Sequence, residues 1–179
     1  MEWIANLSDD DIKHLVFIDE SCAKTNFSPL YGWSMRGERC YGYAPVSWER
    51  YTMLSSIRLD GSTESIIFEK GLDKATFEYF VNDILCKALQ PGDILIMDNL
   101  RAHKIDFHHL KKKKIEVKFL PRYSPDLNPI ELMWSQIKAK LRKTQPRDFN
   151  SLWYEYSVAH LDVTAKDAQG WFKGCGYFH

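Results

Sequence analysis

Three carboxylates stand where folding of the chain could bring them together. Asp19 follows the apolar run LVFI and Asp98 follows the run ILIM, and each run is typical of a buried strand. If these strands are parallel neighbours, both carboxylates lie at one edge of the sheet, where ligands commonly bind. Glu131 begins a helix after a stiff loop with three prolines, and a helix start directed at that edge would bring it beside them.

Such a cluster indicates a particular chemistry. Carboxylates that share a site repel one another unless cations neutralise them. A set of oxygen ligands without cysteine or histidine favours Mg²⁺ or Mn²⁺. Two of these ions, about 3.5–4 Å apart, can activate a water or a 3′-hydroxyl and stabilise the leaving oxygen in phosphodiester transfer. The spacing alone therefore indicates a two-metal phosphoryl-transfer enzyme.

Each carboxylate also has a structural interpretation, which the spacing leaves open. An aspartate after a strand often caps a turn or the next helix. Asn128 and Glu131 have the Asn-x-x-Glu spacing of a capping box, in which the glutamate bonds the helix start. The negative charge of Glu131 also suits the positive end of a helix dipole.

Hydrophobic periodicity and turn signals give the elements that would position these residues. Their order is typical of an α/β domain with a mixed sheet. No internal repeat or linker interrupts the pattern, so we predict one domain over residues 1–179. The expected strands cover 14–18, 51–59, 65–68, 94–97 and 115–120, and the expected helices cover 74–89, 103–112, 149–160 and a segment that begins at Pro129.

The charges are spread unevenly, although 24 basic and 24 acidic side chains make the whole chain neutral. Residues 101–147 carry 13 of the basic and only 4 of the acidic side chains. A basic segment of this kind often contacts a polyanion such as nucleic acid. The alternative is a helix face that only water contacts, and the overall neutrality argues against binding of nucleic acid by charge alone.

Composition excludes several classes of protein. No apolar run approaches the roughly 20 residues of a membrane-spanning helix, and the start of the chain has no secretory signal. We therefore expect no membrane partner. No C-x-x-C pair occurs, so we expect free thiols in a reducing cytoplasm at all four cysteines, which are Cys22, Cys40, Cys86 and Cys175. His108 and His109 do not match a metal-binding pattern either.

Three motifs resemble the catalytic core of the Tc/mariner transposases, and most of all their bacterial insertion-sequence branch. They are FIDES at 17–21, DNLRAH at 98–103 and LPRYSPDLNPIELMW at 120–134. The resemblance implies a ribonuclease H-like fold, with a five-stranded mixed sheet flanked by helices. It also implies the Asp-Asp-Glu triad of that superfamily, and the matching residues here are Asp19, Asp98 and Glu131.

The resemblance further implies a function. The three carboxylates would be the catalytic residues and the ligands of two Mg²⁺ ions, with Mn²⁺ as a substitute. The reaction would cleave DNA at transposon ends and join the freed 3′-hydroxyl to target DNA. Relatives act as homodimers on paired DNA ends, and a bacterial member would work in the cytoplasm at the nucleoid.

Other residues are candidates for supporting roles. Asn99 and His103 match family positions beside the second aspartate, and we interpret them as groups that bond the metal ligands without binding the metal, or as DNA contacts. For His103, a surface or helix-start histidine is an equal alternative. The candidates for contacts with the DNA backbone are all basic, and they are Arg36, Arg39, Arg122 and Lys138.

The chain departs from the family before its first strand. Relatives carry an N-terminal half of helix-turn-helix modules, for which about a dozen residues leave no room. We therefore expect a separately encoded partner half, a trimmed catalytic domain or a decayed remnant. The alternative functions are an inert or partner-dependent DNA-binding relic, and a ribonuclease H-like nuclease that cuts without joining.

Overall fold

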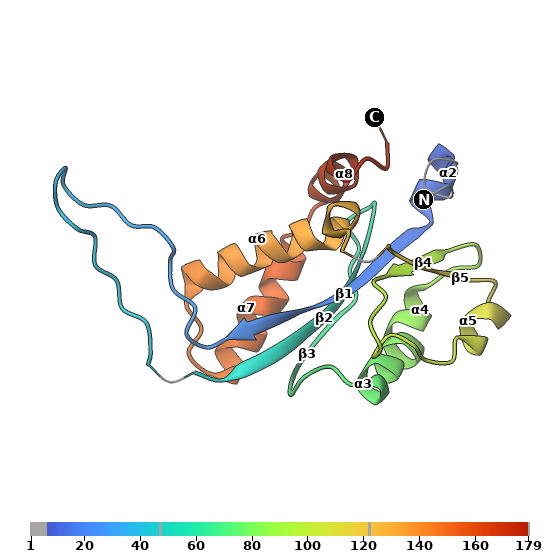
Figure 1. Cartoon of the computed structure of the whole chain (residues 1–179), viewed down its shortest axis with the longest axis horizontal. Helices are drawn as coiled ribbons and strands as arrows, with labels where there is room; N and C mark the ends of the chain where they lie inside the picture. Colours follow the sequence, from blue (N-terminus) through green and yellow to red (C-terminus); the bar gives the residue numbers. More distant parts are fainter. Residues whose placement is uncertain (1–6, 47, 122, 179) are drawn as a thin grey trace.

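The fold is built on a five-stranded mixed sheet. The computed structural model describes residues 7–46, 48–121 and 123–178, in which the strands lie in the order β3-β2-β1-β4-β5 (Figure 1). β2 pairs antiparallel with β1 and β3, whereas β4 pairs in parallel with β1 and β5. This is the predicted five-stranded mixed sheet. Its strands are β1 Leu15–Lys24, β2 Arg50–Arg58, β3 Ser65–Glu69, β4 Ile94–Met97 and β5 Glu116–Phe119.

Helices cover both faces of the sheet (Figure 1). In β1 the buried side chains alternate, so Leu15 and Phe17 join one apolar cluster while Val16 and Ile18 join the other. The first cluster packs under α6 Pro129–Thr144, α7 Phe149–Leu161 and α8 Ala165–Gly174. The second packs under the continuous helical segment of α3 Lys74–Tyr79, the π-helical η1 Phe80–Leu85 and α4 Cys86–Ala88, and under α5 His108–Lys112. No helix in the described part of the chain is long and apolar enough to cross a bilayer.

The first strand is longer than the sequence predicts. The apolar run predicts a strand over 14–18 that ends before Asp19, but β1 continues to Lys24 because its residues pair with β2 along that whole length. The prediction that Asp19 follows the strand is therefore wrong. Asp19 lies within β1, and only the parallel neighbour β4 ends at this level.

Three helices also differ from the predictions. The helix predicted over 103–112 begins only at His108, because His103 turns into the core before it. Two further helices are not predicted at all, α8 and the short α2 Asp9–Lys13. α8 begins with a capping box of Thr164 and Asp167, a signal that the sequence does contain. The helices predicted over 74–89 and 149–160 are confirmed.

A long arm leaves the sheet between β1 and β2 (Figure 1). Its described residues, 25–46 and 48–49, contain no helix or strand. The base is fixed, because the Thr25 N–H donates to the Glu49 carbonyl and the Arg147 guanidinium donates to the Phe27 carbonyl at 2.7 Å. Beyond the base, the exposed large apolar side chains are Leu30, Tyr31, Trp33, Met35, Tyr41, Tyr43, Val46 and Trp48. An exposed apolar surface of this kind often marks an interaction site.

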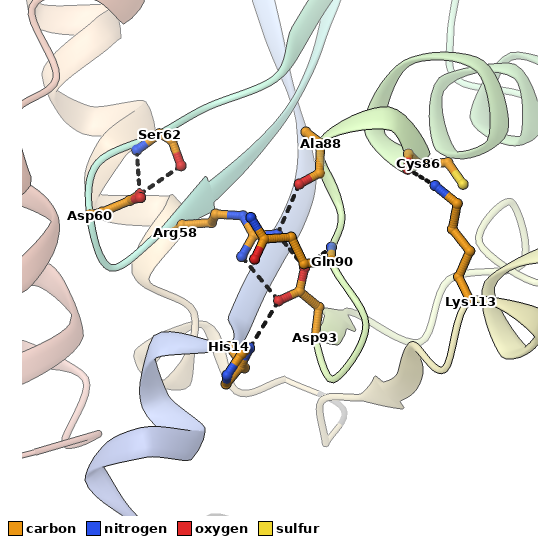
Figure 2. A network of polar contacts seen from close by, with 9 residues as sticks. All are labelled: His14, Arg58, Asp60, Ser62, Cys86, Ala88, Gln90, Asp93 and Lys113. Atoms are coloured by element: carbon orange, nitrogen blue, oxygen red, sulfur yellow. Dashed lines mark hydrogen bonds and ion pairs between the residues drawn. The ribbon is translucent and has the colours of Figure 1, made fainter.

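A buried carboxylate ties the start of β4 to β1 and β2. Asp93 is 1% exposed, and Figure 2 shows it between Arg58 and His14. Arg58 forms an ion pair with it, Nδ1 of His14 lies 3.2 Å from its Oδ1, and the Gln90 N–H donates to its Oδ2 at 2.6 Å. Burial acts to raise the pKa of Asp93, but these hydrogen bonds outweigh burial and hold the pKa below its usual value. The network therefore fixes β4 against its neighbours.

We predict that Asp93→Asn lowers the free energy of unfolding by about 3 kcal/mol, because Arg58 then loses its anion in a largely buried position. A lowered carboxylate pKa contributes stability above the unfolded-state pKa of about 3.9 and loses it as the pH falls through the folded-state pKa. The difference in the free energy of unfolding between variant and wild type should therefore be largest at neutral pH and should shrink in acid. Urea denaturation at a series of pH values measures it. Asp10→Asn removes an exposed ion pair with Lys13 and should change little, so equal losses in both variants would contradict the prediction.

Candidate active site

The register of the sheet places Asp19 beside Asp98. Phe17 of β1 pairs with Ile96 of β4, so two residues further along each strand the chain reaches Asp19 and Asp98. Side chains alternate along a strand, so Asp19 follows Phe17 on the face that α6 covers. β4 ends at Met97, and Asp98 is therefore free of the strand ladder.

The start of α6 brings Glu131 to the same place. Ile130 and Trp134 are buried against the sheet, which leaves Glu131 on the exposed side of the first turn. The capping-box interpretation is wrong, because the Asn128 side chain makes no capping hydrogen bond. In a capping box, Glu131 would accept a hydrogen bond from the backbone N–H of Asn128. That N–H instead donates to the carbonyl oxygen of Pro125 at 3.0 Å. The Glu131 carboxylate is therefore not engaged by the helix start.

The three carboxylates line one cavity of about 470 Å³. Asn99 and Arg101, which follow Asp98 along the chain, contribute to its wall, as does Asn128 at the start of α6. The structure thus brings together Asp19 of β1, Asp98 just after β4 and Glu131 of α6, which are far apart in the sequence.

Of the three carboxylates, Asp19 lies in the environment that is least favourable for its ionised form. Its side chain is buried, with 7% exposed. Burial and the negative charges of Glu20, Glu131 and Asp98 raise the pKa of Asp19 to about 8. Like charges that share a site produce a shift in this direction, and a bound cation would reverse it.

His103 lies behind Asp98. Its ring has no exposed surface and stacks on Phe77, with 4.4 Å between the ring centroids. Nδ1 lies 2.6 Å from Oδ1 of Asp98, and Nε2 lies 2.9 Å from Oε2 of Glu20. Burial acts to lower the pKa of His103, but the contacts with these two carboxylates outweigh burial and raise it to about 10. A fully buried imidazole cannot contact DNA, so the DNA-contact role and the surface role are both wrong for His103, and the supporting role fits.

The oxygen donors that line the cavity suit a divalent cation, although they are not arranged around a single coordination centre. Within the described residues, no three His, Cys, Asp or Glu side chains are arranged to hold a metal ion as they stand, and Asp98 lies against His103 instead. The carboxylates nonetheless offer only oxygen atoms, and Oδ1 of Asn128 is buried without a hydrogen-bond partner. Hard oxygen donors of this kind suit Mg²⁺ or Mn²⁺.

A family match gives this site its context. The model of the DDE superfamily endonucleases matches residues 14–152, a range that holds all three carboxylates. The chain belongs to this family. The DDE catalytic core that the motifs at 17–21, 98–103 and 120–134 predict is thereby confirmed, whereas the bacterial insertion-sequence branch stays a prediction. A search of curated proteins found no sequence that matches this DDE endonuclease.

Solved structures share the ribonuclease H-like fold of this DDE endonuclease. The pre-cleavage transpososome of Mos1 matches with a TM-score of 0.73 at 14% identity, over 93% of this chain and 53% of that chain. The Mos1 transposase catalytic domain with raltegravir and Mn matches with a TM-score of 0.58 at 14% identity, over 92% of this chain and 76% of that one. An intasome of simian T-cell lymphotropic virus with the PP2A subunit B56 gamma gives 0.51 at 10% identity, over 83% and 47%. The DDE endonuclease chain thus spans about half the length of the transposase chain in the Mos1 transpososome.

The residues predicted to contact DNA lie in separate parts of the DDE endonuclease. Asn99 is exposed in the cavity wall. Arg36 and Arg39 are exposed on the arm and do not line the cavity, and Lys138 is half-buried on α6. Arg122 lies outside the described residues.

Sequence reasoning missed two residues that contact this site from behind. Glu20 stands within the FIDES motif next to Asp19, but nothing in the motif shows that its partner is His103, 83 residues away. Phe77 belongs to the predicted helix as one more apolar residue, and only the fold shows that it stacks on His103. Such long-range pairs have no local signal in a single sequence.

We predict that Asp19→Asn stabilises the DDE endonuclease when divalent cations are removed. The unfolded-state pKa is about 3.9 and the folded-state pKa is about 8, so the folded state binds the proton more tightly. Ionisation of Asp19 therefore lowers stability progressively as the pH rises between these values. At pH 8 in EDTA the variant should melt at least roughly 3 °C above wild type, and the gain should vanish near pH 4. Thermal unfolding followed by circular dichroism measures this, and an unchanged melting temperature at pH 8 would refute it.

Proposed function

We propose that this chain is the catalytic domain of a DNA transposase that cleaves transposon ends and joins the 3′-hydroxyl to target DNA. The observation that carries the proposal is the placement of Asp19, Asp98 and Glu131 around one cavity of a DDE endonuclease. The solved structures with the same fold support it, because they include a Mos1 paired-end complex with a transposon end and a Mos1 strand transfer complex.

Asp19, Asp98 and Glu131 are the residues that would hold two Mg²⁺ ions, with Mn²⁺ as a substitute. Mos1 paired-end complexes with Mg and with Mn support this choice. When bound, the ions supply activation of the attacking oxygen and stabilisation of the leaving oxygen. Burial and the neighbouring negative charges raise the pKa of Asp19, and these charges also favour binding of cations at this point.

The rest of the cavity wall would bind the DNA backbone. Asn99 and Arg101 are exposed beside Asp98, so both can bond phosphate oxygens that approach the carboxylates. Tyr123 is 99% exposed at the same cavity and offers an aromatic face on which a base can stack. The chain needs no nucleophile of its own, because water or a 3′-hydroxyl attacks phosphorus in line.

We predict that the purified chain nicks supercoiled plasmid only with Mg²⁺ or Mn²⁺. Asp98→Asn and Glu131→Gln should each reduce nicking by more than about 100-fold, because even loss of an outer partner of a metal site costs about 10–100-fold. DNA affinity, measured by fluorescence anisotropy, should survive both substitutions. If affinity fell together with nicking, misfolding would explain the loss better than chemistry.

The same assay separates the alternatives. Nicking without transfer of the 3′-hydroxyl to a second DNA would indicate a nuclease that cuts without joining. DNA binding without any nicking would indicate either a relic or a catalytic half that depends on a helix-turn-helix partner. Addition of such a partner in trans then distinguishes these two, because only the catalytic half regains activity.

We also propose that the chain acts as a homodimer on DNA and that the arm contributes the contact. The arm exposes a row of aromatic side chains, of which Trp33 is 99% exposed. Covering such apolar surface is favourable, because it removes that surface from water. Arg147 and Arg142 hold the base of the arm through Phe27, so these side chains project from a fixed point.

We predict that the double substitution Trp33→Ser with Tyr43→Ser weakens dimer formation on DNA by at least about tenfold, since exposed aromatic anchors dominate interface free energies. Size-exclusion chromatography with light scattering, with and without DNA, measures the mass. Tyr154→Ser removes an exposed aromatic side chain from α7 and serves as the control. A dimer that persists in the double variant would exclude the arm as the contact.

A further inference from the structure

Glu20 lies next to Asp19 in β1 but projects to the opposite face of the sheet. Because side chains alternate along a strand, Glu20 lies on the same face as Ile18, which is buried in the apolar cluster under α3. Its partner in β2, Leu54, belongs to the same cluster. Glu20 is absent from the wall of the cavity that Asp19 and the other carboxylates line. The sheet itself therefore separates Glu20 from the face of the site that α6 covers.

A single imidazole connects Glu20 to Asp98. Nε2 of His103 lies 2.9 Å from Oε2 of Glu20, and Nδ1 lies 2.6 Å from Oδ1 of Asp98 and 3.2 Å from its carbonyl oxygen. Nε2 faces the Glu20 carboxylate, whereas Nδ1 forms a hydrogen bond with the Asp98 carbonyl oxygen and an ion pair with Oδ1 of the same residue, an atom that is buried and has no hydrogen bond of its own within the described residues. A rotation that improved one contact would lengthen the other, so the position of Glu20 limits where the ring presents Nδ1 to Asp98.

The surroundings hold this connection in place. The ring of His103 is fully buried, and the stacked ring of Phe77 fixes its plane. The backbone of Glu20 is paired within β1, well inside the strand. Asp98, in contrast, follows the last residue of β4 and has no strand partner of its own. Of the three carboxylates in the cavity, Asp98 is thus the one whose orientation depends on contacts outside the strands and helices.

We propose that Glu20 is a positioning residue, which acts through His103 to set the orientation in which the Asp98 carboxylate meets a divalent cation. This inference rests on the proposed function, because it requires Asp98 to be a ligand. Partners that bond the ligands of a metal site typically change metal affinity or activity by about 10–100-fold when they are removed.

Two conservative substitutions distinguish positioning through His103 from a purely electrostatic role of Glu20, because the two roles predict opposite orders of harm. Glu20→Asp keeps the negative charge but is one methylene shorter, so its contact with Nε2 opens beyond hydrogen-bond range. Glu20→Gln loses the charge but keeps an oxygen at the same reach that accepts from Nε2. Positioning through His103 therefore requires that Glu20→Asp is the more harmful change, whereas a role of charge alone requires that Glu20→Gln is.

The experiment is calorimetric titration of the full chain with MnCl₂, without DNA. We expect Glu20→Asp to raise the Kd for Mn²⁺ by about 10–100-fold and Glu20→Gln to raise it less. Glu69→Asp is the matched control, because Glu69 is an exposed glutamate at the end of the edge strand β3, and it should bind as wild type does. Urea denaturation of each variant shows that weaker binding does not reflect loss of the fold.

The results separate the inference from the function on which it rests. Wild-type affinity in Glu20→Asp, or weaker binding by Glu20→Gln than by Glu20→Asp, would overturn the positioning role while Mn²⁺ binding by the wild type still supported the metal site. Failure of the wild type to bind Mn²⁺ would overturn the proposed metal site and the positioning role together.

Discussion

Repulsion between like charges is the constraint on which the rest of this structure depends. Asp19, Asp98 and Glu131 would move apart or take up protons if the chain allowed it. The fold keeps Asp19 and Glu131 near each other, because β1 is paired with β2 through Asp19 and α6 is fixed to the sheet by its buried stripe, so Asp19 takes up a proton more readily instead. The raised pKa of Asp19 shows that the fold holds this carboxylate in place against its own preference. A rigid sheet is thus a requirement of the chemistry, since a flexible support would let the charges relax.

The two ends of the central strands show opposite solutions for a buried aspartate. Asp93 precedes β4 and receives an ion pair from Arg58 and a backbone hydrogen bond, so its pKa is lowered. Asp19 lies at the level where β4 ends, faces other carboxylates, and has a raised pKa. The first arrangement stabilises the sheet, and the second destabilises it but leaves a carboxyl group without a cationic partner, to which a divalent cation can bind. Proteins commonly lose stability at functional sites and gain it elsewhere in the fold.

The sequence predicts what is local and misses what is long-range. The strand at 94–97 and the start of α6 carry their own signals, an apolar run and a proline at the first helical position, and both are confirmed. The extension of β1 beyond Ile18 has no such signal, because its polar residues are held by pairing with β2 rather than by an apolar run. His103 resembles a helix-start histidine in the sequence, and its burial follows only from Phe77 and Glu20. The three sequence motifs identify the carboxylates, but the contacts of His103 with Glu20 and Phe77 behind them can be recognised only in the folded structure.

The alternation of side chains along a strand explains how one dipeptide serves both sides of the site. Asp19 and Glu20 are neighbours in the chain, yet the pleat directs the first to the face under α6 and the second to the face under α3. A shift of β1 by one residue against its neighbours would exchange the two faces, which would place Asp19 among apolar residues and Glu20 in the cavity. The register of β1 with β4 therefore decides that Asp19 lines the cavity and that Glu20 contacts His103 behind it.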